Sequence, residues 1–162
     1  MDLSQDFGTN ERASGRHGRI GPRIVVIGGG ASGVLMALHL LRRRATTRIV
    51  LVEKTDLLGC GVAYGTRDPA HLLNTRVSNM SAYADDPDHF LTWLRAEVDP
   101  DACPFSFVSR AVYGQYLAAS LATAEGRDRL TCRRGEAVRV SPAQDGVLVR
   151  LDENRFVVSC SS

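Results

Sequence analysis

The chain has 162 residues, 44% of them apolar, and a formal net charge of +2 at neutral pH. This length suits one globular domain with a substantial core. No apolar run reaches the roughly 18 residues that a membrane span needs, and the arginines are scattered among acidic residues instead of forming a basic block. We therefore expect a soluble, cytoplasmic protein that binds neither membrane nor nucleic acid.

The N-terminal stretch 1–22 is polar and rich in glycine, serine and arginine. Such a composition buries too little apolar surface to offset the entropy lost on ordering, so we expect a disordered tail. The stretch also lacks the charged segment and apolar core of a targeting signal. The domain is therefore predicted to span residues 23–162.

A glycine-rich turn follows an apolar, β-branched run at residues 24–27 and precedes a run with helical periodicity. The turn reads Gly28-x-Gly30-x-x-Gly33, with Ser32 before the last glycine. This spacing is typical of a dinucleotide-binding unit, where the glycines permit a tight turn, close approach of a pyrophosphate, and close packing of helix on strand. The helix N-terminus favours phosphate. An ordinary glycine turn is the alternative.

An acidic residue follows the second strand-like run. Residues 48–52 lead to Glu53, which stands 20 residues after Gly33. An acid in this position hydrogen-bonds the ribose diol of a dinucleotide. Its charge repels a 2′-phosphate, so the sequence favours FAD or NAD over NADP. The competing interpretation of Glu53 is a solvated strand end.

The sequence after Glu53 predicts a long loop, two helices and several short strands. The loop, residues 54–69, leaves the carboxyl end of the sheet, where ligands bind in open α/β folds, so we expect it to wrap the cofactor. Helical periodicity predicts helices over about 88–97 and 109–125. A parallel strand and then an antiparallel meander are expected, with Asp145-Gly146 as a hairpin turn. The β-rich runs are 130–134, 136–140, 147–151 and 156–159.

The positions of the arginine and cysteine residues in the sequence indicate structural roles. Three arginines, Arg42 to Arg44, end the first predicted helix, about 31–44, where cations complement the helix dipole and cap its carbonyl groups. The four cysteines form no C-x-x-C pair and have no metal-ligand spacing with histidine, so no metal site is predicted. For Cys60, in the loop near the expected cofactor, a small apolar filler is favoured over a redox-active thiol.

Several motifs, in this order, resemble those of the FAD-NAD(P)-binding flavoprotein family, distantly similar to flavin-containing and N-hydroxylating monooxygenases. The resemblance extends from about residue 23 to about residue 151. It rests on the glycine turn with Glu53 and on the segments that follow. These are Ala63-Tyr-Gly-Thr66, His71-Leu-Leu-Asn74, Met80-Ser81, Asp86-Pro87, and Arg110 with Tyr113-Gly114.

The resemblance implies an α/β fold: a Rossmann-like FAD/NAD(P)-binding domain with a central parallel sheet and a small antiparallel meander, incomplete at its C-terminal end. FAD would be the first nucleotide, with Glu53 on its adenosine ribose. The residues expected around the pyrophosphate are Gly28, Gly30, Ser32 and Gly33. Further expected contacts are Asn74 near the isoalloxazine, Arg110 near the FAD, and the backbone of Val138 against adenine. An ordinary turn residue is the alternative for Asn74, and no catalytic residue is assigned.

The family's chains are several hundred residues long and have a second glycine-rich turn for NADPH, so NAD(P)H is expected only in full-length relatives. This sequence has no such second turn. We therefore expect the FAD-binding portion of a larger flavin-dependent, monooxygenase-like oxidoreductase, or a truncated homologue. A dinucleotide-binding module without redox activity is the alternative. The sequence leaves the substrate and the oligomeric state open.

Overall fold

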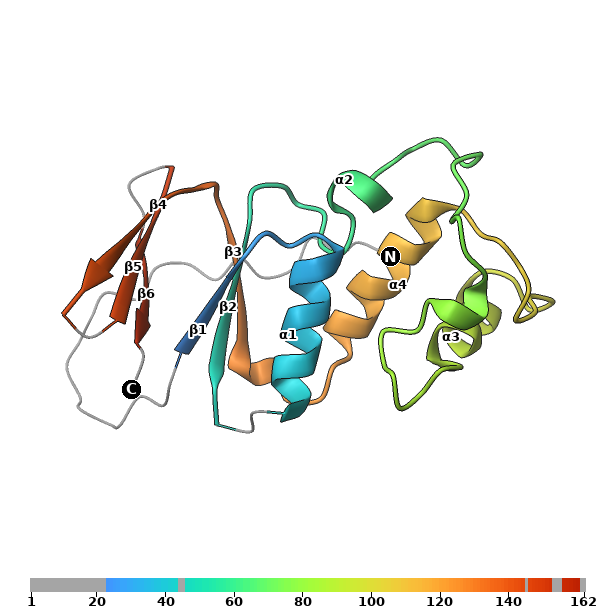
Figure 1. The fold of residues 1–162 in the computed structure, drawn as a ribbon, viewed down its shortest axis with the longest axis horizontal. Helices are drawn as coiled ribbons and strands as arrows, with labels where there is room; N and C mark the ends of the chain where they lie inside the picture. The colour runs from blue at the N-terminus through green and yellow to red at the C-terminus, as the bar shows by residue number, and fades with distance from the viewer. Residues whose placement is uncertain (1–22, 44–45, 145, 153–155, 161–162) are drawn as a thin grey trace.

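A parallel sheet lies at the centre of the molecule, with helices on one side and a second sheet on the other. The computed structural model describes residues 23–43, 46–144, 146–152 and 156–160, so the predicted N-terminal tail lies outside it. Helices cover one face of the three-stranded parallel sheet, and a separate antiparallel sheet stands on the other side (Figure 1). This arrangement confirms the predicted fold class.

The predicted strand–turn–helix–strand unit is present. β1 (Arg23–Ile27) leads into α1 (Ala31–Arg43), and β2 (Arg48–Glu53) runs parallel to β1. Residues 49–52 of β2 are buried without a break, as expected for a parallel strand covered on both faces. The sequence pattern therefore located this unit correctly.

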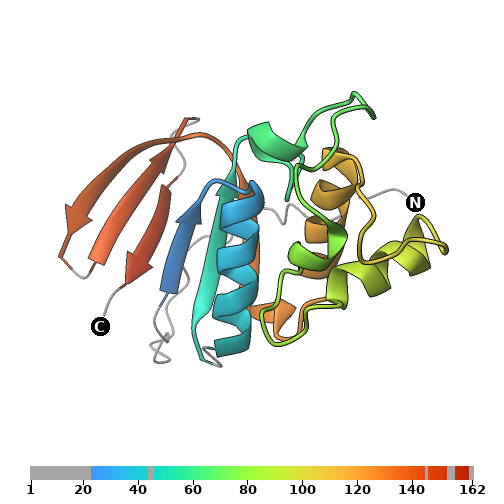
Figure 2. The same cartoon turned by 45° about the vertical axis from the view of Figure 1, so that its right-hand side comes forward.

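A long connection brings the third strand to the far side of β2. β3 (Leu130–Arg134) pairs in parallel with β2, which gives the strand order β1-β2-β3. Among the helices of the connection, α4 lies beside α1 over the sheet, while α3 lies further out (Figure 2). The helical segments are α2 (Gly61–Tyr64), α3 (His89–Glu97), α4 (Arg110–Ala122) and the 3-10 turns Val77–Asn79 and Arg127–Arg129.

Two predicted boundaries in this connection differ from the structure. The loop 54–69 contains the short helix α2, which has no side-chain cap and no buried residue, so nothing in its own sequence indicated a helix. The helix predicted over 109–125 ends at Ala122. Thr123 is the C-terminal cap, and both its N–H and its hydroxyl donate to the carbonyl of Ala119.

The C-terminal strands form the predicted meander. β4 (Ala137–Ala143), β5 (Gly146–Leu151) and β6 (Phe156–Cys160) are antiparallel neighbours in that order. Ala143 pairs with Gly146, so β4 and β5 are joined by a two-residue hairpin at the predicted place, although Asp145 itself lies outside the described residues. β4 extends past its predicted end at residue 140 because Pro142 and Ala143 still pair with β5.

The parallel sheet separates two hydrophobic clusters. Alternate residues of β2 point to opposite faces, so Ile49 and Leu51 join the cluster under the helices while Val50 and Val52 join the other one. The helix-side cluster is the larger, and its big buried side chains include Leu38, Phe90, Tyr116 and Leu117. The second cluster, between the two sheets, has Val149 and Leu151 as its other buried members.

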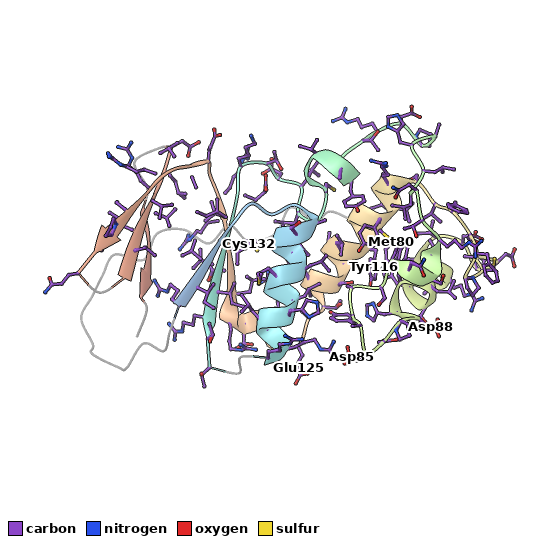
Figure 3. The ribbon with its side chains drawn as sticks, in the orientation of Figure 1. Met80, Asp85, Asp88, Tyr116, Glu125 and Cys132 are labelled. Carbon is purple, nitrogen blue, oxygen red and sulfur yellow. The ribbon has the colours of Figure 1, made fainter. Side chains whose placement is uncertain are left out.

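Tyr116 connects α4 to α3 inside the larger cluster. Its hydroxyl accepts a hydrogen bond from the Ala82 N–H at 2.9 Å and lies 2.8 Å from Nδ1 of His89 (Figure 3). Burial raises the pKa of Tyr116, so this side chain remains a neutral phenol. The outer helix is thus attached by a polar link as well as by packing.

The C-terminal end of α1 is held by residues distant in sequence. Arg129 donates to the carbonyl of Leu41 at 2.6 Å and to that of Thr47 at 3.2 Å. Arg42, which we predicted to cap α1 carbonyls, instead forms a two-fold ion pair with Asp85 at 2.6 and 2.9 Å. A bidentate pair between a guanidinium and a carboxylate is stronger than a hydrogen bond to a carbonyl group, which explains why Arg42 binds Asp85 and does not cap α1.

Candidate functional site

The glycine turn between β1 and α1 is shaped by two steric requirements. Gly28 has φ of 97°, which a side chain would strain, and its N–H donates to the carbonyl of Val52 at 2.8 Å. A Cβ at Gly33 would collide with the carbonyl oxygen of Gly28 and lie 3.5 Å from Cγ1 of Val26. The structure thus confirms the predicted tight turn at Gly28 and the close helix–strand packing at Gly33.

Glu53 lies at the carboxyl end of β2, beside the turn. Its Oε2 accepts the N–H of Gly29 at 2.6 Å, and its Oε1 accepts both the N–H and the hydroxyl of Thr55 at 2.9 Å. Partial burial raises the pKa of Glu53, but these hydrogen bonds outweigh that effect and hold the pKa below its ordinary value. The carboxylate is therefore ionised at neutral pH and fixed against the mouth of the turn.

The loop after β2 folds back over the turn. The N–H of Gly59 donates to the carbonyl of Gly29 at 2.8 Å. Gly30 faces Gly61 so closely that a Cβ at Gly30 would lie 3.3 Å from the Gly61 Cα. In this way α2, which begins at Gly61, is placed at the N-terminal end of α1 (Figures 1 and 2).

A cavity of about 530 Å³ opens between the turn, the first turns of α1, and α2. No acidic or basic side chain lines it. The predicted residues Gly28, Gly30, Ser32 and Gly33 all belong to its wall. The remaining lining residues are Ile27, Ala31, Leu35, Cys60, Gly61, Val62, Ala63, Tyr64 and Tyr113.

One side of the cavity consists of a thiol and two phenols. The rings of Tyr64 and Tyr113 meet edge to face, with centroids 4.9 Å apart. Burial raises the pKa of Tyr113, and it raises that of the Cys60 thiol as well. Because a raised pKa lowers the thiolate fraction, the environment of Cys60 suits the predicted filler better than a reactive thiol.

The other predicted contacts lie outside this cavity. Glu53 bonds Gly29, and neither residue lines the cavity. Asn74 is exposed on the surface. Arg110 begins α4, where its Nε donates to the carbonyl of Leu72 at 3.2 Å. Val138 is half exposed on β4. The contacts of these residues with a cofactor remain predictions.

Sequence reasoning missed several residues of the cavity wall. Leu35, whose helical spacing with other apolar residues of α1 predicts a core position, also lines the cavity while packing against the core. Tyr64 and Tyr113 belong to motifs of the family, and the sequence assigns neither of them a contact with the cofactor. Their signal was present as aromatic residues next to glycine, in Tyr64-Gly65 and Tyr113-Gly114. Only the folding of α2 against α4 shows that they share one wall.

Neither a metal-binding cluster nor a membrane-spanning helix is present among the described residues. No group of three or more His, Cys, Asp or Glu side chains in this part of the chain is arranged to hold a metal ion. Likewise, none of the helices that the structure describes is long and apolar enough to cross a bilayer.

The parallel sheet, the glycine turn with Glu53 and the antiparallel meander together form a Rossmann-like domain. The chain belongs to the FAD-NAD(P)-binding family, whose model matches residues 25–160. A comparison with curated proteins finds no match.

Solved structures of flavin enzymes share this fold. OTEMO in complex with FAD and NADP superposes with a TM-score of 0.57 and 17% identity over 86% of this chain. The ornithine N-hydroxylase KtzI of Kutzneria sp. 744 gives a TM-score of 0.63 and 17% identity over 84%. A flavin monooxygenase from Stenotrophomonas maltophilia gives 0.55 and 20% over 83%. The chain spans only 24%, 35% and 35% of these three proteins, respectively.

Proposed function

We propose that this chain binds FAD across the glycine turn, with the diphosphate at the N-terminus of α1 and the adenosine ribose at Glu53. The observation that carries the proposal is the cavity, whose wall at the turn includes Gly28, Gly30 and Gly33, three residues without a side chain. A helix N-terminus presents free N–H groups and a partial positive charge, both of which favour phosphate.

The electrostatics of the cavity support an anionic ligand. Its lining contains no carboxylate that would repel a diphosphate. Since it contains no arginine or lysine either, the attraction comes from backbone dipoles. Glu53 stands apart, on the far side of Gly29. Such an arrangement keeps the acid away from the phosphates but close to a ribose attached to them.

Glu53 keeps part of its capacity to accept hydrogen bonds. A carboxylate has about four acceptor positions, and Gly29 and Thr55 occupy three of them. The backbone of Lys54 also contributes to holding the carboxylate, and we propose that a ribose hydroxyl adds to these bonds at Oε2. This supports recognition of the sugar by an acid that the fold has already oriented.

We further propose that the chain supplies the FAD-binding part of a flavin-dependent oxidoreductase of the monooxygenase type. The support is the family match over residues 25–160 and the shared fold of longer flavin enzymes. A bound flavin supplies the redox chemistry, while the residues described here bind and orient it. The nicotinamide-binding part would then be provided by additional polypeptide.

A binding module without redox activity is the second candidate. It is favoured by a cavity wall without histidine, lysine or carboxylate side chains, in which Cys60, Tyr64 and Tyr113 are the remaining groups that could take part in general acid–base catalysis. The two candidates differ in the ligand they retain. An oxidoreductase part holds FAD, whereas a module of this kind binds NAD as well as FAD or in its place.

The test places a negative charge in the proposed diphosphate site. Ser32 is exposed in the first turn of α1 and lines the cavity. In Ser32→Glu, the new carboxylate suits the helix dipole, so the fold is retained, but it repels a diphosphate. Titration calorimetry with FAD, at low ionic strength, is expected to show affinity lower by about tenfold or more.

The matched control is Met36→Glu, which adds the same charge one turn along α1, at a side chain outside the cavity wall. This variant should bind FAD like the unsubstituted protein. Equal FAD affinity in Ser32→Glu would contradict the diphosphate site. Binding of NAD but not FAD by the unsubstituted protein would favour the second candidate.

A further inference from the structure

Tyr113 is a buried polar side chain in the wall of the cavity. It lies on α4 with 5% of its surface exposed. Its ring packs edge to face against Phe90, at a centroid distance of 5.3 Å, and against Tyr64 at 4.9 Å. The orientation of the ring is therefore fixed by its neighbours before any ligand arrives.

The hydroxyl of Tyr113 has no hydrogen-bond partner among the residues that the structure describes. Buried polar groups are nearly always paired. In the described chain the only fully enclosed side-chain polar atom without a partner is Oγ of Ser120, so the hydroxyl of Tyr113 still meets solvent. Tyr113 is one of the residues that line the cavity, which is the open space next to this side chain. An oriented donor is thus available to a bound molecule.

The protonation state of the Tyr113 phenol allows it to donate a hydrogen bond. Burial is the largest effect on Tyr113 and raises its pKa above the ordinary value for tyrosine. The phenol consequently keeps its proton at every pH at which the protein would be used. A neutral hydroxyl can donate to a phosphate oxygen or to a sugar-like hydroxyl.

The position of Tyr113 relative to Glu53 indicates which part of a dinucleotide it meets. Gly29 contacts Glu53, whereas the next residue, Gly30, contacts Gly61 at the start of α2. The cavity extends from the turn toward α2 and Tyr113, and Glu53 is not part of its wall. A dinucleotide with its adenosine at Glu53 therefore directs its other half toward Tyr113.

We propose that the Tyr113 hydroxyl donates a hydrogen bond to the polyol segment that follows the pyrophosphate, the ribityl chain in FAD. This inference rests on the proposed function and adds a recognition residue for the non-adenosine half of the ligand. Tyr113 is a binding residue in this proposal, with no part in proton transfer.

The experiment compares FAD with ADP, which has the adenosine and diphosphate but lacks the ribityl chain and the flavin. Titration calorimetry is performed on the unsubstituted chain and on Tyr113→Phe, which removes only the hydroxyl. The variant is expected to bind FAD about three- to tenfold more weakly and to bind ADP unchanged. Thermal unfolding of the variant without ligand verifies that the fold is retained.

The matched control is Tyr83→Phe, which removes a hydroxyl from a half-buried ring beside Arg42, outside the cavity wall. It should alter neither affinity. An equal loss for FAD and ADP in Tyr113→Phe, or no loss for either, would overturn the role of Tyr113 and leave FAD binding intact. A chain that binds neither ligand before substitution would overturn the proposed function together with this inference.

Discussion

Glu53 has a structural task in the protein without ligand, in addition to its proposed one. Its carboxylate ties the end of β2 to the Gly29 N–H and to Thr55. Hydrogen bonds to an ionised acceptor are stronger than those between neutral groups. The residue that we expect to recognise the ribose therefore also holds the turn in shape.

This double task predicts how Glu53→Gln depends on pH. The glutamine amide cannot accept at both ends, so at neutral pH the variant should be less stable to urea by about 1–2 kcal/mol. The pKa of Glu53 is lowered by folding, so the carboxylate contributes stability above the pKa of unfolded glutamate, about 4.3. That contribution is lost as the pH falls through the folded-state pKa.

The difference in unfolding free energy between the two proteins should therefore shrink on acidification. Urea titrations at neutral pH and below about pH 4 measure it. The control is Glu125→Gln, an exposed glutamate in the turn after α4 (Figure 3), which should change stability little at either pH. A difference that stays constant with pH would show that the charge of Glu53 has no part in the stability of the turn.

At the scale of elements, α1 depends on a residue that follows α4. The carbonyl of Leu41 is one of the groups that a helix leaves unpaired at its C-terminus, and Arg129 bonds it together with the carbonyl of Thr47. The same side chain thus connects the end of α1, the start of β2 and the turn before β3.

Arg129→Met should accordingly lower the unfolding free energy by about 1–3 kcal/mol, because it leaves partly buried carbonyl groups without a donor. Arg43→Met removes an exposed arginine from the last turn of α1 and is the matched control, with an expected effect below about 0.5 kcal/mol. Urea unfolding measures both. Equal stability of the two variants would indicate that the Arg129 bonds contribute nothing net.

The elements differ in how far the sequence could predict them. β1, α1 and β2 followed from apolar periodicity and glycine spacing, because these patterns are local. The helix α2 and the cap by Arg129 could not be predicted, since both depend on residues brought together by folding. The candidate site divides in the same way: its glycine half is encoded within one turn, whereas Tyr64 and Tyr113 meet only through tertiary packing.

At the scale of the whole molecule, the two hydrophobic clusters hold their elements with different strength. The antiparallel sheet packs through the smaller cluster, in which Val149 and Leu151 are buried. The helices and one face of the parallel sheet share the larger one. Regions with fewer buried contacts open at lower free energy, so β5 should open before β2 does.

Hydrogen exchange under native conditions tests this with one substitution in the larger cluster. Leu117→Ala should lower the opening free energy of β2 amides by about 2–5 kcal/mol, because those amides exchange only on global unfolding. Amides of β5 should be unaffected as long as their local opening remains the easier route. The companion variant Val149→Ala should lower the opening free energy of the β2 amides and that of the β5 amides. Equal loss at β2 and β5 in Leu117→Ala would show that the molecule opens as one unit.

The bond between Gly29 and Glu53 restricts how the turn can hold an anion. The N–H of Gly28 is committed to Val52 and that of Gly29 to Glu53, so both donors are spent within the protein. The N–H groups left for a phosphate are those of the first turn of α1, because the first N–H groups of a helix have no partner within the helix. If the proposed diphosphate site is correct, its selectivity depends on the spacing of the amides in the first turn of α1, and the glycines contribute by shaping the backbone.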